Sequence, residues 1–245
     1  GILALALIPF LAARPPAAPA RDRLTVLTYN VQQGYDAAGQ WNTAGQLALM
    51  AALDPDIIGL QETDGARIAN GNVDIVRYFA DRLDMHSYYG PKSVTGTFGI
   101  ALLSKYPIEH PRTYFLFSEG EQVAVIEAEI LVGDTRFTLF VNHLGNGGPP
   151  IQQEQFLTLI KDQAHVIALG DWNFRPTTPQ YANMLALLND SWTQRWPDWV
   201  DDQGQNPGQR KIDHIFLSPE LRTLDARFLD SPASDHPAVA ATLTW

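Results

Sequence analysis

Polar residues that can do chemistry follow several apolar runs in this sequence. The run "HVIALG" leads directly into Asp171 and Asn173, and "FVNHL" carries His143 at its end. Two earlier runs, "RLTVLTYN" and "DIIGLQE", end at Asn30 and Glu62. In α/β folds, side chains at strand ends converge on a common crevice. The pattern therefore predicts one site that is assembled from distant parts of the chain.

Two more polar groups come shortly before β-branched runs near the end of the chain. "KIDHIF" holds Asp213 and His214, and "SDHPAV" holds Asp235 and His236. Carboxylate and amide oxygens suit a hard cation such as Mg²⁺. Histidines with spare carboxylates suit acid/base chemistry at a phosphorus centre. One such residue alone is more often a turn residue or a structural histidine, so the prediction depends on how many occur together.

Other hydrolase signatures are absent from the sequence. There is no Gly-rich phosphate loop with a lysine, and neither G-x-S-x-G nor H-E-x-x-H occurs. Readings as a P-loop enzyme, a serine hydrolase or a zincin therefore have no support. The chain has no cysteine, which excludes disulfides and thiolate sites but is compatible with any redox compartment.

The composition is that of a folded, acidic protein. Hydrophobic residues make up 45% and charged residues 18% of the 245 residues, which suits one large α/β domain or two small ones. The formal net charge is −10, and basic residues occur only in short groups such as Arg210 and Lys211. Binding of a long nucleic acid is therefore disfavoured, because a polyanion would be repelled.

The segment 1–22 differs from the rest of the chain. It combines an apolar run, too short for the roughly 20 residues of a membrane crossing, with the stiff Pro/Ala linker "RPPAAPA". We expect a remnant of a membrane helix or of a signal sequence, with a plain flexible extension as the alternative. This predicts a membrane-associated or extracytoplasmic protein, with the folded catalytic domain at 23–245.

Hydrophobic periodicity predicts strands that alternate with helices. Helices are expected at 42–54, 72–84, 151–163 and 178–189. Strands are expected at 23–31, 56–62, 98–108, 121–132, 135–144, 165–171, 211–218, 224–230 and 237–245. This order indicates an α/β domain with mixed sheets.

Six motifs, in the order "TYN", "GLQE", "VNHL", "GDWN", "IDHIF" and "SDHPAV", resemble those of the endonuclease/exonuclease/phosphatase superfamily over about residues 24–245. Longer stretches such as "YNVQQGYDAAGQWN" and "NHLGNGGPP" are similar to the C-terminal domain of membrane proteins that remodel GPI-anchor lipids to ceramide, the PGAP-two-interacting protein type. The resemblance implies a four-layer, DNase-like sandwich in which helices flank two packed mixed β-sheets.

The resemblance also implies roles for individual residues. Mg²⁺, or Mn²⁺ in its place, would be bound by Glu62, Asn30 and Asp235. The catalytic residues would be His143, Asp171, Asn173, Asp213 and His236. Of these, His236 would activate the attacking water, oriented by Asp213 or Asp235, although family members differ and Asp171 can take that role instead. His143 would hydrogen-bond a non-bridging phosphate oxygen.

Three further residues are expected to bind substrate: His214, Arg67 and Asn146. His214 stands where many relatives carry an aromatic residue. The segment "SVTGTFG" and the group Trp192, Trp196 and Trp199 could form a lipid- or sugar-facing rim, or could equally serve as loop and core.

The predicted function is that of a Mg²⁺-dependent phosphodiester hydrolase at a membrane surface. Its substrate would be a GPI, phosphoinositol or phosphosphingolipid head group, cleaved in the manner of a phospholipase C. A secreted or periplasmic nuclease is an alternative, but it would need a basic groove. A non-catalytic module that recognises inositol lipids is another, and it would not need Glu62 or His236. The oligomeric state stays open.

Overall fold

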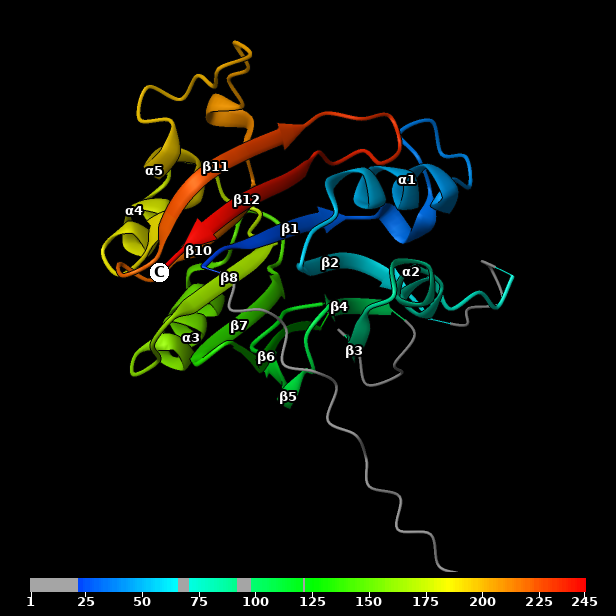
Figure 1. Ribbon diagram of the computed structural model, residues 1–245, viewed down its shortest axis with the longest axis horizontal. Helices are drawn as coiled ribbons and strands as arrows, with labels where there is room; N and C mark the ends of the chain where they lie inside the picture. Colours follow the sequence, from blue (N-terminus) through cyan, green and yellow to red (C-terminus); the bar gives the residue numbers. More distant parts are fainter. Residues whose placement is uncertain (1–21, 66–70, 92–97, 121) are drawn as a thin grey trace, which may run out of the picture.

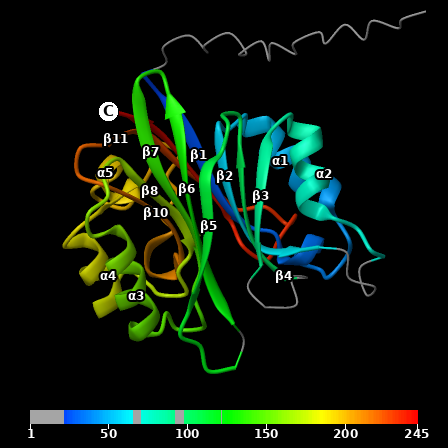
Figure 2. The same ribbon diagram turned by 90° about the horizontal axis from the view of Figure 1, so that it is seen from below.

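Two six-stranded mixed β-sheets pack face to face, and helices cover the outer face of each (Figures 1 and 2). The computed structural model describes residues 22–65, 71–91, 98–120 and 122–245. The expected sandwich of two mixed sheets flanked by helices is confirmed. Residues 1–21 lie outside the described part, so the reading of the N-terminal segment stays a prediction. Among the helices of the described part, none has the length and apolarity needed to cross a membrane.

The first sheet contains the earliest and the latest strands of the sequence. Its spatial order is β11 (Arg222–Leu229), β12 (Ala238–Thr244), β1 (Leu24–Asn30), β2 (Ile57–Asp64), β4 (Phe98–Ser104) and β3 (His86–Pro91). The second sheet has the order β5 (Glu109–Leu116), β6 (Val123–Val132), β7 (Thr135–His143), β8 (Val166–Asp171), β10 (Asp213–Leu217) and β9 (Asn189–Asp190).

One parallel pair lies near the middle of each sheet, and this arrangement decides where polar strand ends meet. β1 runs parallel to β2, and β7 runs parallel to β8, with His143 opposite Asp171. β10 is antiparallel to β8, so its first residue, Asp213, also lies opposite Asp171. β12 is antiparallel to β1, which brings the residues before Ala238 to the end of β1. The functional motifs therefore share one end of the sandwich.

The main apolar core lies between the two sheets, and two further cores lie between the sheets and their helices. The sheets approach each other closely where β2 crosses β8. A Cβ atom at Gly59 would lie 2.8 Å from Cβ of Leu169, so only glycine fits there without a shift. Gly59 is thus a position where the sequence determines the spacing of the two sheets.

Of the α-helices in the described part, all but the third begin at a residue whose side chain caps the helix. In chain order, the helices are α1 (Thr43–Leu53), α2 (Ile75–Leu83), α3 (Pro150–Ile160), α4 (Pro179–Leu185) and α5 (Ser191–Arg195), with short 3₁₀ turns η1 (Gln32–Gly34) and η3 (Gly208–Arg210). Asn42 caps α1 by accepting from the Gly45 N–H at 3.0 Å, and Asp74 caps α2 through the Arg77 N–H at 2.9 Å. All four predicted helices are present as α1 to α4, with slightly different bounds.

Periodicity did not predict β3, β5, β9 and α5. β3, β5 and β9 are edge strands, and most side chains of β5 are exposed or half-buried. An edge strand of this kind buries little surface, so its sequence shows weak alternation. The strand expected at 98–108 ends at Ser104, and the chain turns there into β5.

Candidate active site

Seven of the predicted site residues form one connected group at the shared end of the sheets. Four of them end or begin strands (β1, β7, β8 and β10), one lies near the end of β2, and two lie in the loops that follow β8 and precede β12. They are Asn30, Glu62, His143, Asp171, Asn173, Asp213 and His236. Residues separated by up to 206 positions in the sequence thus meet in one place, as the strand-end pattern predicts.

Asn30 connects the two sheets through its amide. Its Nδ2 donates to Oε1 of Glu62 and to Oδ2 of Asp171, both at 3.1 Å, and its Oδ1 accepts from the Gln32 N–H at 3.1 Å. Asn30 is fully buried, so these contacts fix the orientation of its amide. A side chain of the first sheet therefore holds a carboxylate of each sheet in place.

Asp171 has one carboxylate oxygen at the centre of the group. Its Oδ2 lies 3.5 Å from Nε2 of His143 and 3.7 Å from Nε2 of His236, in addition to the contact with Asn30. Its Oδ1 accepts from the Asn173 N–H at 3.0 Å. Asp171 is almost completely buried, and both its oxygens are thus held in a fixed orientation.

His236 is oriented by Asp213. Its Nδ1 lies 3.0 Å from Oδ2 of Asp213, which turns Nε2 toward Asp171. From the sequence, either Asp213 or Asp235 is expected to orient His236. The hydrogen bond is to Asp213, whereas Asp235 is exposed on the loop beside His236.

The surroundings raise the pKa values of both Asp171 and His236. Burial, together with repulsion by Asp213, raises the pKa of Asp171 to about 7, although His236 and Asn30 act in the opposite direction. Burial alone would lower the pKa of His236, but the hydrogen bond and charge of Asp213, with smaller effects of Asp171 and Asp235, raise it to about 10. At neutral pH His236 is therefore a cation, whereas Asp171 can gain or lose a proton.

Two site residues have left-handed backbone conformations. Glu62 has φ 52°, at a point where the register between β2 and β4 shifts, and Asn173 has φ 54°. Bulges near active sites redirect side chains, and such conformations persist only where the surroundings stabilise them. Asn173 is held by its Nδ2, which donates to the Leu144 carbonyl at 2.8 Å. The local backbone thus turns both side chains away from regular strand geometry.

Through hydrogen bonds, Ser234 stabilises the loop that carries His236, a role that the sequence analysis did not assign. Its Oγ donates to the Asn30 carbonyl at 2.7 Å and accepts from the His236 N–H at 3.3 Å. The only signal in the sequence is its position directly before Asp235. Asp235 itself lies on the same loop and stays a candidate cation ligand.

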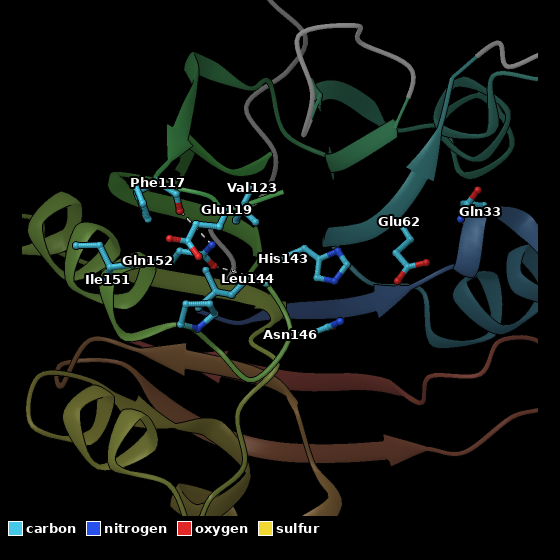
Figure 3. A pocket seen from close by; sticks show the side chains of 12 residues that line it. Gln33, Glu62, Phe117, Glu119, Val123, His143, Leu144, Asn146, Ile151 and Gln152 are labelled. Atoms are coloured by element: carbon cyan, nitrogen blue, oxygen red, sulfur yellow. Dashed lines mark hydrogen bonds between the residues drawn. The ribbon is translucent and has the colours of Figure 1, made fainter. Parts of the chain in front are cut away.

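A cavity of about 780 Å³ opens beside Glu62 and His143, and Asn146 also lines it (Figure 3). Its other lining residues include Gln33, Glu119 and Gln152, which sequence reasoning missed because they lie in turns or on a helix without a motif. A second cavity of about 560 Å³ borders Asp213, Asp235 and His236. The connected group thus lies between two hollows.

One predicted contact with substrate, His214, does not fit this arrangement. His214 is fully buried, with Nδ1 2.8 Å from Oδ2 of Asp190 and Nε2 3.3 Å from the Phe174 carbonyl. Successive residues of a strand point to opposite faces, so His214 points away from the site that Asp213 faces, and its placement as a substrate-binding residue is wrong. Arg67 lies outside the described residues.

The suggested tryptophan rim is also corrected in part. Trp192 is fully buried and its Nε1 donates to the Trp199 carbonyl at 3.3 Å. Trp196 donates in the same way to the Ala226 carbonyl at 2.9 Å. Trp192 thus belongs to a packed core, whereas Trp196 and Trp199 are half-buried. Residues 93–97 of the other suggested segment lie outside the described part.

The donors at this site fit a hard cation on the Glu62 side. Asp171, Asp213 and His236 offer ligand atoms within 4.8 Å of one another, but Nδ1 of His236 already contacts Asp213 and its Nε2 faces Asp171. Glu62 instead presents a half-buried carboxylate to the cavity, next to the amide of Asn30. A carboxylate oxygen such as that of Glu62 is a ligand that Mg²⁺ prefers, and Asn30 could add only its Oδ1, since the atom that now faces Glu62 is the donor Nδ2.

The model of the Endonuclease/Exonuclease/phosphatase family matches residues 27–236. The chain belongs to this family. Members of this family are typically hydrolases of phosphoester bonds and generally use divalent metals. The chain is also similar to Protein cwh43 of Schizosaccharomyces pombe, with 35% identity over 94 residues, which are 38% of this chain and 10% of that relative. This match thus spans about a tenth of the relative's length.

Solved structures of the family share the fold at low sequence identity. A family member from Beutenbergia cavernae superposes with a TM-score of 0.76 at 18% identity, over 91% of this chain and 72% of that one. The catalytic domain of human Nocturnin with bound sulfate gives 0.69 at 20% identity, over 91% and 95%. A mannosyl-6-phosphatase from Bacteroides thetaiotaomicron gives 0.66 at 18% identity, over 91% and 100%. At these identities the likeness shows the fold alone.

Proposed function

We propose that this chain is a Mg²⁺-dependent phosphodiester hydrolase that acts, like a phospholipase C, on a GPI, phosphoinositol or phosphosphingolipid head group. The observation that carries the proposal is the connected group in which Asn30 holds both Glu62 and Asp171, while Asp171 faces His143 and His236. The resemblance to GPI-remodelling proteins supports the choice of a lipid.

The reaction assigns a separate task to each side chain. Asp171, whose pKa is about 7, accepts a proton from the water that attacks phosphorus. Asn173 positions that water, and the bond from phosphorus to the leaving alcohol breaks. The departing oxygen takes up a proton from solvent while Asp171 returns its proton to solvent, which leaves an alcohol and a phosphomonoester. His236 as a cation and His143 donate hydrogen bonds to phosphoryl oxygens as negative charge develops. A cation held by Glu62, Asn30 and Asp235 would supply further positive charge next to the phosphate.

The sequence left two candidates for the general base, His236 and Asp171, and this assignment selects Asp171. A His236 that keeps its proton at neutral pH is a hydrogen-bond donor and not a proton acceptor. Fixed donors around a developing charge are often the largest catalytic contribution, and loss of one costs about 10²–10³-fold in rate.

The test uses the purified chain with Mg²⁺ and three separate substrates: vesicles with phosphatidylinositol, vesicles with sphingomyelin, and plasmid DNA. We expect release of a phosphorylated head group from a lipid, and no release in EDTA. Glu62→Gln should abolish most of this release, whereas the exposed Glu154→Gln should not. Nicked plasmid without lipid cleavage would instead identify a nuclease, and lipid binding without turnover would identify a recognition module.

A further inference from the structure

The cavity beside His143 has an apolar end. Phe117 and Ile151 line it, and they leave 53% and 44% of their surfaces exposed. Figure 3 shows these two side chains at one end, Glu62 at the other and His143 between them. Single exposed apolar residues are common, but here two of them share a hollow with catalytic groups.

Hydrogen bonds hold this apolar end in place. The Phe117 N–H donates to Oε1 of Gln155 at 2.7 Å, and the Phe117 carbonyl accepts from Nε2 of Gln152 at 3.1 Å. Gln152, which lies on α3, also accepts from the Gly145 N–H at 2.8 Å, and this hydrogen bond connects the loop after β7 to α3. Ile151 lies in the first turn of that helix, α3. The exposed surface is therefore a fixed part of the cavity wall.

Negative charge in the cavity limits which substrate group can extend along its apolar wall. Among the described residues that line the cavity, the carboxylates are Glu62 and Glu119, and none is a lysine or arginine. A second phosphate group on this side would meet negative charge without a cationic partner. The other cavity differs in having the exposed Arg210 on its wall, although Asp213, Asp230 and Asp235 also line it. The larger cavity therefore favours an uncharged extension of the substrate.

We infer that Phe117 and Ile151 bind the hydrocarbon part of a phosphodiester amphiphile whose phosphate lies at His143 and Glu62. This inference rests on the proposed function and adds a direction to it, since the apolar substituent would extend toward α3. The volume of about 780 Å³ suits a lipid segment together with the phosphate and is in the range of ligand pockets.

The test compares two soluble esters, methyl p-nitrophenyl phosphate and dodecyl p-nitrophenyl phosphate, below the concentration at which the second forms micelles. For the protein as it stands with Mg²⁺, we expect a higher kcat/KM for the dodecyl ester. The double variant Phe117→Ser/Ile151→Ser should reduce the ratio of the two kcat/KM values at least tenfold. Leu131→Ser is the matched control, because Leu131 is 44% exposed like Ile151 but lies on β6 outside the cavity, and it should leave the ratio unchanged.

Binding gives a readout that does not depend on turnover. Dodecyl methyl phosphate is titrated into each protein in EDTA by calorimetry, and the double variant should bind at least tenfold more weakly. Hydrolysis of both esters with an unchanged ratio would overturn the apolar site and leave the proposed hydrolysis intact. If neither ester is hydrolysed, the proposed function fails, and the calorimetry alone decides: weaker binding by the double variant upholds the inference and equal binding overturns it.

Discussion

Asp171 and His236 show how one environment can prepare two residues for opposite tasks. Both pKa values are raised, but with different results. The pKa of Asp171 lies near neutral pH, so Asp171 can gain or lose a proton there, whereas the pKa of His236 lies well above neutral pH, so His236 keeps its positive charge. Burial is the main cause of the raised pKa of Asp171, with added repulsion by Asp213. Burial alone would lower the pKa of His236, but the hydrogen bond and charge of the same Asp213 raise it. The pair therefore depends on a third residue that need not touch substrate.

The charge of His236 can be measured directly. In the metal-free protein we expect its ring to stay protonated up to about pH 9 and to titrate near pH 10 in NMR spectra. Because this pKa lies above the unfolded value of about 6.5, its stabilising contribution is complete below about pH 6.5 and is lost as the pH rises through about 10. Asp213→Asn should lower the pKa, and the exposed Asp162→Asn should not. A ring that is neutral at pH 7.5 would contradict the assignment.

Asp171→Asn should reduce turnover by about 10²–10⁴-fold, because an amide cannot accept the proton. In the unsubstituted protein, activity should fall as the pH drops below about 7, where Asp171 becomes protonated. A raised carboxylate pKa disfavours the folded state increasingly from about pH 4 to about pH 7, so the variant should melt no lower than the parent at pH 8. Rate assays with Asp162→Asn as control test this, and full activity of Asp171→Asn would rule out its role as the base.

At the scale of elements, the spacing of the sheets depends on Gly59. Gly59→Ala adds a Cβ 2.8 Å from Cβ of Leu169, and overpacking of this kind costs about 1–3 kcal/mol of unfolding free energy. Gly65→Ala is the control, because its added Cβ would meet nothing closer than 3.7 Å. Urea unfolding compares the two, and equal stability would mean that the sheets can separate slightly without penalty.

A buried ion pair supports β10 behind the site. Nζ of Lys211 lies 2.9 and 3.0 Å from the two oxygens of Asp190, and both side chains are fully buried. Burial alone would raise the pKa of Asp190, but Lys211 and His214 keep it below its ordinary value. Lys211→Met should therefore cost about 3–5 kcal/mol, since it leaves a buried carboxylate without its cation.

The control for this pair is Arg227→Met, which removes a partly exposed ion pair with Asp202 and should cost about 1 kcal/mol or less. Chemical denaturation measures both variants. If they lose similar stability, the buried pair has no special structural role.

The sequence allowed the central elements to be predicted better than the edges. The strands that carry Asn30, Glu62 and Asp171 at or near their ends have buried, apolar interiors with a clear signal, whereas β3 and β5 are half-covered edge strands. The site residues could be predicted because their strands are central. The sheet face to which His214 points could not be predicted, because neighbouring residues of a strand point to opposite faces and the sequence alone does not show which face lies toward the site. Cavity residues such as Glu119 lie in turns, where no periodicity applies.

At the scale of the whole molecule, the site exists only when both sheets are packed together. Glu62 and Asn30 belong to one sheet, and Asp171, His143 and Asp213 belong to the other. A cation bound between strand ends of the folded chain is absent from the unfolded chain, so binding should stabilise the fold.

Mg²⁺ at 100 times its Kd should add about 2.7 kcal/mol, which for a chain of this size corresponds to a rise in Tm of roughly 5–10 °C. Thermal unfolding with and without Mg²⁺ measures this shift. Glu62→Gln should lose it, and Glu154→Gln should retain it. A shift of equal size in Glu62→Gln would place the ion elsewhere.

The order of strands in the first sheet has a consequence for biosynthesis. β1 lies between β2 and β12, yet β12 follows every other strand in the sequence. While the ribosome is still translating, one side of β1 stays without its neighbour, and an open strand edge invites pairing with other chains. His236 and Ser234 emerge only just before β12. Until this last segment is available, the connected group of polar side chains is incomplete and the open side of β1 is vulnerable to mispairing.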